Sequence, residues 1–530
     1  MSGADARGQR SSWGWGDERS HLDASEQRAL GEQAAALLGV APRAPMTPRD
    51  VGDLHVPAPR LRPPAALAAI VDATAPERVA HARGNSFRDV VRAFHGELPT
   101  YPDLVVFPRA AVDVVAILDW VADAGAVCIP FGGGTSVVGG VDPPALDRPV
   151  VTLDLRAMGR LLEVDPTSLA AHIEGGATGP DIEDALRPDG LTLRFFPQSW
   201  EFSTLGGWIA TRAAGHYATL QTHIDDLVES VRAETPTGRW ESRRVPASGA
   251  GPSPDRLLLG SEGTLGVITD AWVRVQRRPT FRAAADVTFA SFDAGCDAVR
   301  ALAQSGLYPA NCRLLDPGEA LVSGAGDGSA ALLVLGFESA DHPVEAALAR
   351  AIELCADHSG RASSLDGATP DSDGSASWRR TFLRAPYLRD ALVALGFVVE
   401  TFETATTWDR LHATVAVVID AVRAAATEVC GAAAVTARLT HAYPDGAAPY
   451  FTVIAPGRRG AEVAQWDEIK VAASEALLAA GATITHHHAI GRDHRPWYDR
   501  QRPEPFARAL AAAKAAVDPR GVLNPGVLLG

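Results

Sequence analysis

The sequence predicts an α+β protein of two or three domains, on three observations. Residues 101–280 hold three loops in which glycines stand beside serine or threonine, each close to an apolar run. Residues 281–480 alternate strand-like apolar runs with alanine-rich helical stretches, which is typical of a sheet covered by helices. The chain of 530 residues is long enough to bury a sizeable core.

Charge and cysteine content indicate an ordinary cytosolic enzyme. The net charge of −15 argues against broad nucleic-acid binding. Five cysteines lie far apart without a CxxC pair, so reduced thiols are expected rather than disulfides or a cysteine metal site. The start lacks the apolar core of a secretion signal, and no run approaches the ~20 apolar residues of a spanning helix. We therefore expect a cytoplasmic protein, with at most a peripheral contact at the inner face of the membrane.

The first hundred residues carry little chemistry. A polar tail with Trp13 and Trp15 precedes a predicted helix at 25–38 and proline-rich connections at 41–64. The two tryptophans could anchor a partner or a lipid surface, but packing on the main body of the protein is the favoured interpretation.

The most informative stretch is PFGGGTS, residues 130–136, which follows the apolar run 126–129. Three glycines leave no Cβ to block a phosphate, and successive backbone N–H groups can line one concavity, with Thr135 and Ser136 adding hydroxyl donors. A plain turn is the alternative for a triple glycine taken alone. The spacing matches neither GxGxxG before a helix nor a P-loop, so neither a Rossmann NAD site nor a P-loop site for a nucleoside triphosphate is indicated.

Regular elements and two further loops surround this stretch. Strands are predicted at 102–108, 150–155 and 170–174, and helices at 112–124 and 179–186. The second loop spans 196–208 and the third 260–269; both combine glycines with hydroxyl residues. Three such loops in one region indicate one long polar ligand that passes several backbones.

The segments IPFGGGTSVVGGV, SWEFSTLGGWIATRAAG and LLLGSEGTLGVIT resemble the FAD-binding motifs of the vanillyl-alcohol-oxidase and p-cresol-methylhydroxylase type of flavoenzyme. The resemblance implies a two-subdomain FAD-binding domain. Because no His or Cys lies inside the three loops, non-covalent FAD is favoured. The FAD contacts that the resemblance implies are Pro130, Gly132, Gly133, Gly134, Thr135, Ser136, Ser199, Thr204, Gly207, Glu262 and Ile268.

The second half is predicted to hold a cap of antiparallel sheet and helices, with strands at 283–289 and 331–337 and helices at 294–303 and 343–356. Residues 359–377 read as a mobile loop, either a connector or a lid. A strand is predicted at 480–485. The closing segment DPRGVLNPG resembles the end of the same flavoenzymes, which implies a cap inserted into the FAD domain. The expected parts are an N-terminal extension (1–100), the first FAD part (101–280), the cap (281–480) and a C-terminal part that completes the flavin site (481–530).

One subgroup of these flavoenzymes, alkylglycerone-phosphate synthase, is similar over nearly the whole chain. Its motifs match WGWG at 13–16, HIDDL at 223–227, CRLLD at 312–316, YLRD at 387–390, ETFET at 400–404, RLT at 438–440, PYF at 449–451 and the triple histidine. The resemblance implies exchange of the acyl group of an acyl-dihydroxyacetone phosphate for a long-chain alcohol, giving an ether without net redox change. Lipid substrates and a homodimer are the expected partners, and no nucleic acid.

Tyr450 matches the proton-transfer residue of that subgroup, and a phenol needs a neighbouring histidine or cation to act near neutral pH. His486, His487 and His488 can supply it. In an extended segment His486 and His488 would share one face and His487 the other. A Tyr packed at a strand end and a His-x-His metal site are the alternatives; no third ligand is evident in sequence, so no metal is predicted.

Other matches imply substrate contacts. Arg389 is the predicted phosphate ligand and Arg313 a second arginine near the phosphate, with surface ion pairs as the plain alternative. Thr401 keeps a hydroxyl that the resemblance implies, and His223 and Asp226 match polar positions beside the flavin, where helix capping is another role for the aspartate. Two other functions stay open. One is a 2-hydroxy-acid dehydrogenase or oxidase of the D-lactate or glycolate type, which lacks support because such relatives carry Glu-His-Gly-Ile-Gly where this chain has HHAIG at 487–491. The other is a flavin- or lipid-binding protein without turnover.

Overall fold

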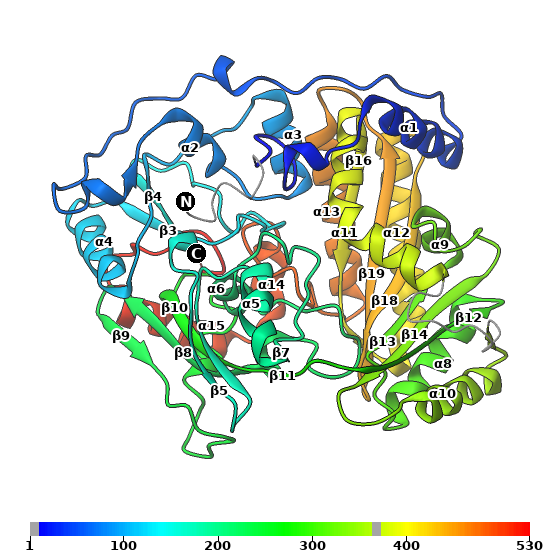
Figure 1. The fold of residues 1–530 in the computed structure, drawn as a ribbon. Coiled ribbons are helices and arrows are strands. Elements are labelled where there is room, and N and C mark those ends of the chain that lie inside the picture. The colour runs from blue at the N-terminus through cyan, green and yellow to red at the C-terminus, as the bar shows by residue number, and fades with distance from the viewer. Residues whose placement is uncertain (1–9, 363–372, 530) are drawn as a thin grey trace.

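The computed structural model describes residues 10–362 and 373–529. Figure 1 shows a region of short sheets beside a region built on one long, curved sheet. The first small sheet has the order β1-β2-β4-β3, with β2 and β3 parallel to β4. Its strands are β1 (Val71–Asp72), β2 (Leu104–Val106), β3 (Val127–Phe131) and β4 (Val150–Asp154).

The second small sheet is antiparallel, in the order β5-β6-β10-β8-β9. Its strands are β5 (Leu161–Asp165), β6 (Ala170–Glu174), β8 (Val228–Thr235), β9 (Gly238–Glu241) and β10 (Val267–Arg274); β7 (Leu191–Thr192) pairs separately with β11 (Gln276–Arg277). The helices of this region are α2 (Ala75–Ala80), α3 (Phe87–His95), α4 (Ala111–Asp123), α5 (Gly179–Leu186), α6 (Leu205–Thr211) and α7 (Asp255–Leu258).

The long sheet is antiparallel and has the order β15-β12-β14-β13-β18-β19-β16, with β17 on β19. Its strands are β12 (Phe281–Phe289), β13 (Asn311–Leu315), β14 (Ala331–Ser339), β15 (Arg361–Ala362), β16 (Phe397–Glu403), β17 (Thr406–Thr407), β18 (Ala434–Ala442) and β19 (Gly446–Pro456). Its helices are α8 (Phe292–Gln304), α9 (Pro317–Val322), α10 (Glu345–Asp357), α11 (Asp373–Ala394), α12 (Trp408–Cys430) and α13 (Glu462–Ala479). The predicted class, α+β with an antiparallel cap, is confirmed.

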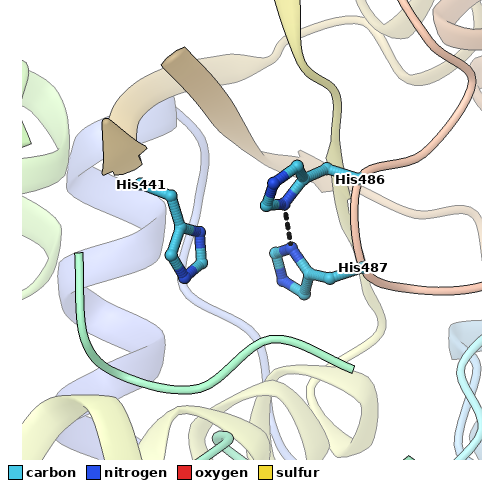
Figure 2. Close-up of side chains that lie close together, drawn as sticks. All are labelled: His441, His486 and His487. Carbon is cyan, nitrogen blue, oxygen red and sulfur yellow. Dashed lines mark hydrogen bonds between the residues drawn. The ribbon is translucent and has the colours of Figure 1, made fainter. Parts of the chain in front are cut away.

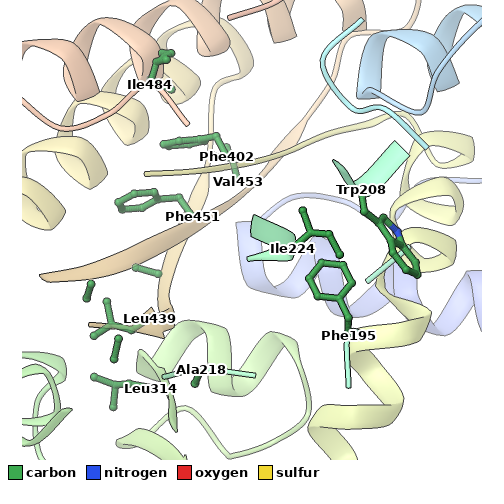
Figure 3. Packing of buried hydrophobic residues seen from close by; sticks show 14 of the residues in the cluster. Phe195, Trp208, Ala218, Ile224, Leu314, Phe402, Leu439, Phe451, Val453 and Ile484 are labelled. Carbon is green, nitrogen blue, oxygen red and sulfur yellow. The ribbon is translucent and has the colours of Figure 1, made fainter. Parts of the chain in front are cut away.

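Side chains on the long sheet alternate between an apolar face and a polar one, because successive residues of a strand point to opposite sides. Phe402 and Phe451 are register partners whose rings stack 4.9 Å apart, and they pack into the core with Leu439 and Leu314 (Figure 3). The residues between them line a cavity instead. The sheet therefore serves as the wall between a hydrophobic core and a functional site.

The C-terminal residues return to the first small sheet after α14 (Arg495–Gln501) and α15 (Glu504–Val517). The N–H of Cys128 on β3 donates to the carbonyl of Val522 at 2.8 Å, and the N–H of Asn524 donates to the Cys128 carbonyl at 2.9 Å. Val522 and Leu523 are buried in the core of that sheet. The end of the chain thus lies beside the strand that carries the triple glycine.

The N-terminal tryptophans pack on the protein, as favoured from the sequence. Trp13 meets the ring of Phe94 edge-on at 4.9 Å, and Trp15 meets Phe202 edge-on at 5.8 Å. The predicted helix at 25–38 is α1 (Ala24–Leu38), which Asp23 caps by accepting the N–H of Glu26. Within the described part of the chain, no helix is both long and apolar enough to cross a bilayer.

Two local predictions are wrong. Residues 480–485 are a loop, not a strand: Gly481 has a positive φ of 69° after α13, and the N–H of Ile484 donates to the Gln501 side chain instead of to a neighbouring strand. The predicted loop at 359–377 contains β15 and the start of α11, from Asp373; its central part, 363–372, lies outside the described residues, so its role as connector or lid stays untested.

Candidate active site

A cavity of about 340 Å³ lies between the glycine loops and the polar face of the long sheet. Of the predicted cofactor contacts, Gly132, Gly133, Gly134, Thr135, Ser136, Ser199, Thr204 and Gly207 line it. Of the other predicted site residues, Tyr450, His487, His488, Arg389, Arg313 and Thr401 line it. Segments from opposite ends of the chain thus meet around one space.

The glycine loop is held so that its backbone donors face away from the protein. Arg10 donates to the carbonyl of Gly133, and the Asn85 amide donates to the carbonyl of Gly134 at 2.7 Å. In a trans peptide the N–H points opposite to the C=O, so the N–H groups of Gly134 and Thr135 point the other way. Neither N–H has a hydrogen-bond partner within the described residues. These donors fit an anion such as a pyrophosphate.

The glycines are required by the neighbouring loop as well as by a phosphate. A Cβ on Gly133 would lie 1.9 Å from the carbonyl oxygen of Phe202, and one on Gly132 would lie 2.2 Å from Oγ1 of Thr204. Thr204 also caps α6 by accepting the N–H of Gly207 at 3.3 Å. The first two predicted FAD loops are therefore in direct contact, and together they fit a long dinucleotide.

Three of the predicted cofactor contacts do not line the cavity. Pro130 is the residue before the end of β3, and Ile268 is buried in β10. Glu262 accepts the N–H groups of Ile490 and Gly491 at 2.9 and 2.8 Å, which ties the third loop to the C-terminal part. Burial raises the pKa of Glu262 to about 7. Their contact with FAD stays a prediction.

Tyr450 lies at the centre of a polar row across the long sheet. On one side it pairs in register with Glu403 of β16, and on the other with Arg438 of β18. Cross-strand partners point to the same face, so all three side chains share the cavity side. The guanidinium carbon of Arg438 lies 3.7 Å from the centroid of the Tyr450 ring, and Arg438 forms an ion pair with the buried Glu319.

The surroundings of the Tyr450 phenol have opposing effects on its pKa. Burial raises its pKa above the ordinary value, while the charge of Arg438 and a hydrogen bond with Thr401 act to lower it. Thr401 is half-buried on β16, two residues before Glu403. The same phenol is thus withdrawn from water and yet stabilised in its ionised form by a cation on the ring face.

Glu403 fixes the triple histidine in a turn. Its carboxylate accepts the N–H groups of His486, His487 and His488 at 2.5, 3.1 and 2.9 Å. Burial would raise the pKa of Glu403, but the neighbouring imidazoles and the hydrogen bonds outweigh it and the pKa is lowered. The predicted alternation of histidine faces is wrong, because this carboxylate curls the backbone and brings the adjacent rings together.

The histidine rings form a cluster against Tyr450. Nδ1 of His486 lies 3.0 Å from Nδ1 of His487 (Figure 2), and the His487 ring stacks on Tyr450 with centroids 6.2 Å apart. His441 of β18 is the third member in space: one nitrogen of each of His441, His486 and His487 lies within 4.8 Å of the others. Burial lowers the pKa of His441 to about 3 and the pKa of the other two well below the ordinary value.

The cluster is already hydrogen-bonded, which argues against a metal. His441 Nε2 lies 3.0 Å from the carbonyl of Gly215, and its Nδ1 lies 3.1 Å from Oγ1 of Thr440. A cation bound here would have to replace those contacts. The absence of a metal nevertheless stays a prediction.

The two predicted phosphate ligands are buried differently. Arg389 on α11 donates to Asp390 and to the carbonyl of Asn85 at 2.7 Å, and Asp390 in turn accepts the N–H of Trp15. Arg313 on β13 donates to the carbonyl of His216 at 3.1 Å and lies over the Phe382 ring. Burial and the charge of Arg438 lower the pKa of Arg313 to about 9, so it stays charged at neutral pH.

His223 and Asp226 do not line the cavity. His223 lies behind the histidine wall, with Nε2 at 3.0 Å from Nε2 of His486. Asp226 is exposed, whereas its neighbour Asp225 is buried and bonds Arg212 and Arg256. The contact of His223 and Asp226 with a flavin stays a prediction.

Sequence reasoning did not assign three residues that the geometry makes prominent: Glu403, Arg438 and His441. Glu403 and Arg438 belong to motifs that the resemblance covers, but their proximity to Tyr450 follows from strand register. A bulge between Leu439 and His441 lets the consecutive Thr440 and His441 both line the cavity.

Comparison with known proteins places this arrangement in a family. The FAD binding domain family matches residues 102–242, and the family of FAD linked oxidases, C-terminal domain, matches residues 278–528. The chain is 30% identical over 485 residues to alkyldihydroxyacetonephosphate synthase of Trypanosoma brucei brucei, with 85% of this chain and 77% of that protein covered. The chain belongs to the alkyldihydroxyacetonephosphate synthase family.

Solved structures agree with this assignment. A structure of alkyldihydroxyacetonephosphate synthase is 25% identical and superposes with a TM-score of 0.83, covering 98% of each chain. p-Cresol methylhydroxylase with substrate bound is 14% identical, with a TM-score of 0.70 over 95% of this chain and 97% of that one, which shows the shared fold. The predicted FAD cofactor is confirmed by the matching FAD binding domain.

Proposed function

We propose that this member of the alkyldihydroxyacetonephosphate synthase family replaces the acyl group of an acyl-dihydroxyacetone phosphate by a long-chain alcohol. The products are an alkyl ether and a fatty acid, with no net oxidation or reduction. The observation that carries the proposal is the single cavity in which Tyr450, the histidines and two arginines face the glycine loop. D-lactate and glycolate, the substrates of the alternative oxidoreductase, have no long chain to cover the apolar residues of this lining.

The glycine loop and the middle loop would hold FAD through backbone N–H groups and the hydroxyl of Thr135. When bound, FAD supplies an electron-poor ring that stabilises negative charge on a substrate carbon beside it. The protein supplies the rest: a proton acceptor, cations for the phosphate and an apolar space for the chains.

Tyr450 is the proposed group that takes the proton from C1 of the substrate and later returns it. The guanidinium on its ring face and the Thr401 hydroxyl stabilise the phenolate, as their effect on its pKa indicates. His487, stacked on the same ring, offers a second nitrogen base at the cavity wall. Burial keeps bulk water from direct contact with both groups, so protons reach them through the substrate or through neighbouring side chains.

Arg313 and Arg389 are the proposed phosphate ligands, because both arginines are among the residues that line the cavity. The apolar lining would accept the acyl and alkyl chains; it includes Val322, Phe382, Leu388, Leu392, Val399 and Ile454. Burying each methylene of such a chain contributes ~0.8 kcal/mol, which favours long chains over short ones.

The test is a reaction of the purified flavoprotein with palmitoyl-dihydroxyacetone phosphate and deuterated hexadecanol. Mass spectrometry should find palmitate and the deuterated hexadecyl ether in equal amounts, with the flavin spectrum oxidised at the end. Tyr450→Phe is the matched control and should retain FAD. Anaerobic bleaching by D-lactate or glycolate, without ether formation, would instead establish the oxidoreductase.

The same proposal includes a homodimer. It also includes a peripheral membrane contact, because both substrates are lipids. Light scattering after size exclusion should give twice the 55.6 kDa mass of the chain. Flotation with vesicles that contain hexadecanol should bring the protein to the lipid fraction. A monomer that stays with the soluble fraction would contradict these two points and leave the ether-forming activity to be judged by itself.

A further inference from the structure

Three imidazoles are connected in series behind the cavity wall. His487 lines the cavity, and its Nδ1 lies 3.0 Å from Nδ1 of His486. Nε2 of His486 lies 3.0 Å from Nε2 of His223, and Nδ1 of His223 lies 3.0 Å from the carbonyl oxygen of Arg212. His486 and His223 therefore each use both ring nitrogens in one continuous chain, which runs from His487 at the cavity to the partly exposed His223.

The carbonyl at the end of this chain decides where the protons are. A carbonyl oxygen only accepts hydrogen bonds, so Nδ1 of His223 carries a proton, and a neutral His223 then has a bare Nε2. That nitrogen accepts from Nε2–H of His486, whose bare Nδ1 accepts from Nδ1–H of His487. The result is a bare Nε2 on His487, the nitrogen that is left for a group in the cavity.

We propose that His487, His486 and His223 form a proton relay in which the Arg212 carbonyl sets the tautomers, so that His487 Nε2 accepts a proton from the cavity while His223 releases another to solvent. The inference rests on the proposed function for the source of the proton. It makes His486 and His223 positioning and proton-carrying residues behind the wall.

The groups around the chain agree with this tautomer pattern. Tyr443 Oη lies 2.8 Å from Nε2 of His486 and 2.9 Å from Oγ1 of Thr222, so it can accept from the imidazole and donate to the hydroxyl. If Tyr443 donated to His486 instead, two bare nitrogens of His486 and His223 would face each other at 3.0 Å. Glu403 Oε2 lies 3.7 Å from Nδ1 of His487, which favours a proton on that nitrogen.

The neutral state of the rings follows from their burial. Burial lowers the pKa of His223, and it lowers the pKa of His486 and His487 further, because neighbouring imidazoles add to it. A neutral imidazole carries one proton and one lone pair, which is the requirement for relaying.

The proton balance closes over the proposed reaction. A proton taken at His487 Nε2 releases the Nδ1 proton to His486, which releases its Nε2 proton to His223, which gives its Nδ1 proton to water. C1 of the ether product needs a proton back, and the same steps in reverse supply it. The starting tautomers are then restored, and the relay has carried one positive charge from the cavity to solvent and back.

Neutron diffraction from crystals of the perdeuterated holoprotein tests the tautomers without any turnover. Deuterons are expected on Nδ1 of His487, Nε2 of His486 and Nδ1 of His223, with none on Nε2 of His487. A deuteron on that last nitrogen would overturn the relay. So would a stoichiometric metal ion between His441, His486 and His487, which anomalous scattering from the same crystals would reveal.

Turnover in D2O tests the transport. The relay protons exchange with solvent before turnover, so the wild-type rate plotted against the D2O fraction should give a curve, which shows that more than one proton moves in the step. His223→Gln should lower the rate at least about 10-fold and give a straight line, because an amide accepts from His486 without passing a proton on. The exposed His412→Gln is the matched control and should behave as wild type. A lower rate in His223→Gln together with the curved plot of the wild type would reduce His223 to a structural role. If no ether is formed by the wild type, the proposed function fails, while the neutron result still decides the tautomer pattern.

Discussion

The guanidinium carbon of Arg438 lies over the ring of Tyr450, 3.7 Å from its centroid, and the two residues are direct partners on β18 and β19. The cation is therefore fixed by backbone register and not by a flexible loop. It acts to lower the pKa of a phenol that burial raises. Register thus couples the fold of the cap to the chemistry of the cavity.

Replacing this cation should move the pH dependence of the reaction. In Arg438→Gln the pKa of Tyr450 should rise, so the limb of the pH–rate profile that needs the phenolate should shift to higher pH. Arg438→Lys keeps the charge without the planar contact and should shift less. Because Glu319 loses its partner in the glutamine variant, Glu319→Gln/Arg438→Gln is the control that separates stability from titration. If this limb of the pH–rate profile moves in neither glutamine variant, a group other than Tyr450 titrates there.

Removal of the Tyr450 hydroxyl should abolish ether formation while the cofactor stays bound. In Tyr450→Phe the loss of the proton acceptor should lower the rate by ~10²–10⁴, the usual range for a general acid or base. The ring and its stacking on His487 remain, so the flavin absorbance per protein should match the wild type. A rate within a few-fold of wild type would assign proton removal to His487 alone.

Replacing Glu403 should affect both stability and rate, although Glu403 is not among the residues that line the cavity. In Glu403→Gln one acceptor oxygen becomes an amide donor that faces N–H groups of His486, His487 and His488. Leaving such donors unpaired should lower the free energy of unfolding by ~1–3 kcal/mol and lower the rate, because the imidazoles lose their positions. Urea unfolding and initial rates measure the two effects. The exposed carboxylate of Glu475, changed to Gln, should alter neither by more than ~0.5 kcal/mol or a few-fold.

A methyl group on the middle glycine of the triple should disrupt the contact between two loops. Gly133→Ala places a Cβ 1.9 Å from the Phe202 carbonyl, and backbone on both sides must move. We expect a loss of ~1–3 kcal/mol of unfolding free energy and weaker FAD binding, measured by denaturation and by flavin fluorescence titration. Gly249→Ala is the matched control, because a Cβ there meets nothing within 4 Å. Equal affinity for FAD in both variants would contradict the role of this contact.

Acid should destabilise the protein through His441. Burial lowers the pKa of this imidazole to about 3, against ~6.5 in the unfolded chain. Between those values the unfolded chain binds a proton that the folded protein does not, so the free energy of unfolding falls as the pH falls, by about 2 kcal/mol at pH 5. Urea unfolding at pH 5.0 and 7.5 should show a smaller difference in His441→Gln than in wild type. If His412→Gln reduces the difference between the two pH values by the same amount, burial of His441 is not the cause of that difference.

Local sequence predicted the regular elements well where they depend on local patterns. The strand at 170–174 and the helix at 179–186 are β6 and α5 with the same bounds. The strand predicted at 480–485 is a loop, because Gly481 has a positive φ and the N–H of Ile484 donates to the side chain of Gln501 on α14. A local sequence pattern cannot reveal a partner that a later helix brings in.

Some residues of the site are predicted by sequence motifs, and others become evident only from strand register. Tyr450, the triple histidine and both arginines were found by motif, and the structure brings Tyr450, His487, Arg313 and Arg389 to one cavity. Arg438 and Glu403 became evident only through their register with Tyr450. His441 lines the cavity because of the bulge on β18, and no residue spacing in the sequence predicts that bulge.

The contacts of Arg10 and Asn85 with the carbonyls of Gly133 and Gly134 are made by the protein's own side chains. The peptide dipoles of that loop are therefore oriented during folding, before any dinucleotide arrives. Capture of the cofactor should need little rearrangement, so stripped protein should regain activity when mixed with fresh FAD. The enzyme would then accept synthetic flavins of altered electron affinity, and the share of catalysis that comes from the ring could be measured separately from that of the surrounding side chains.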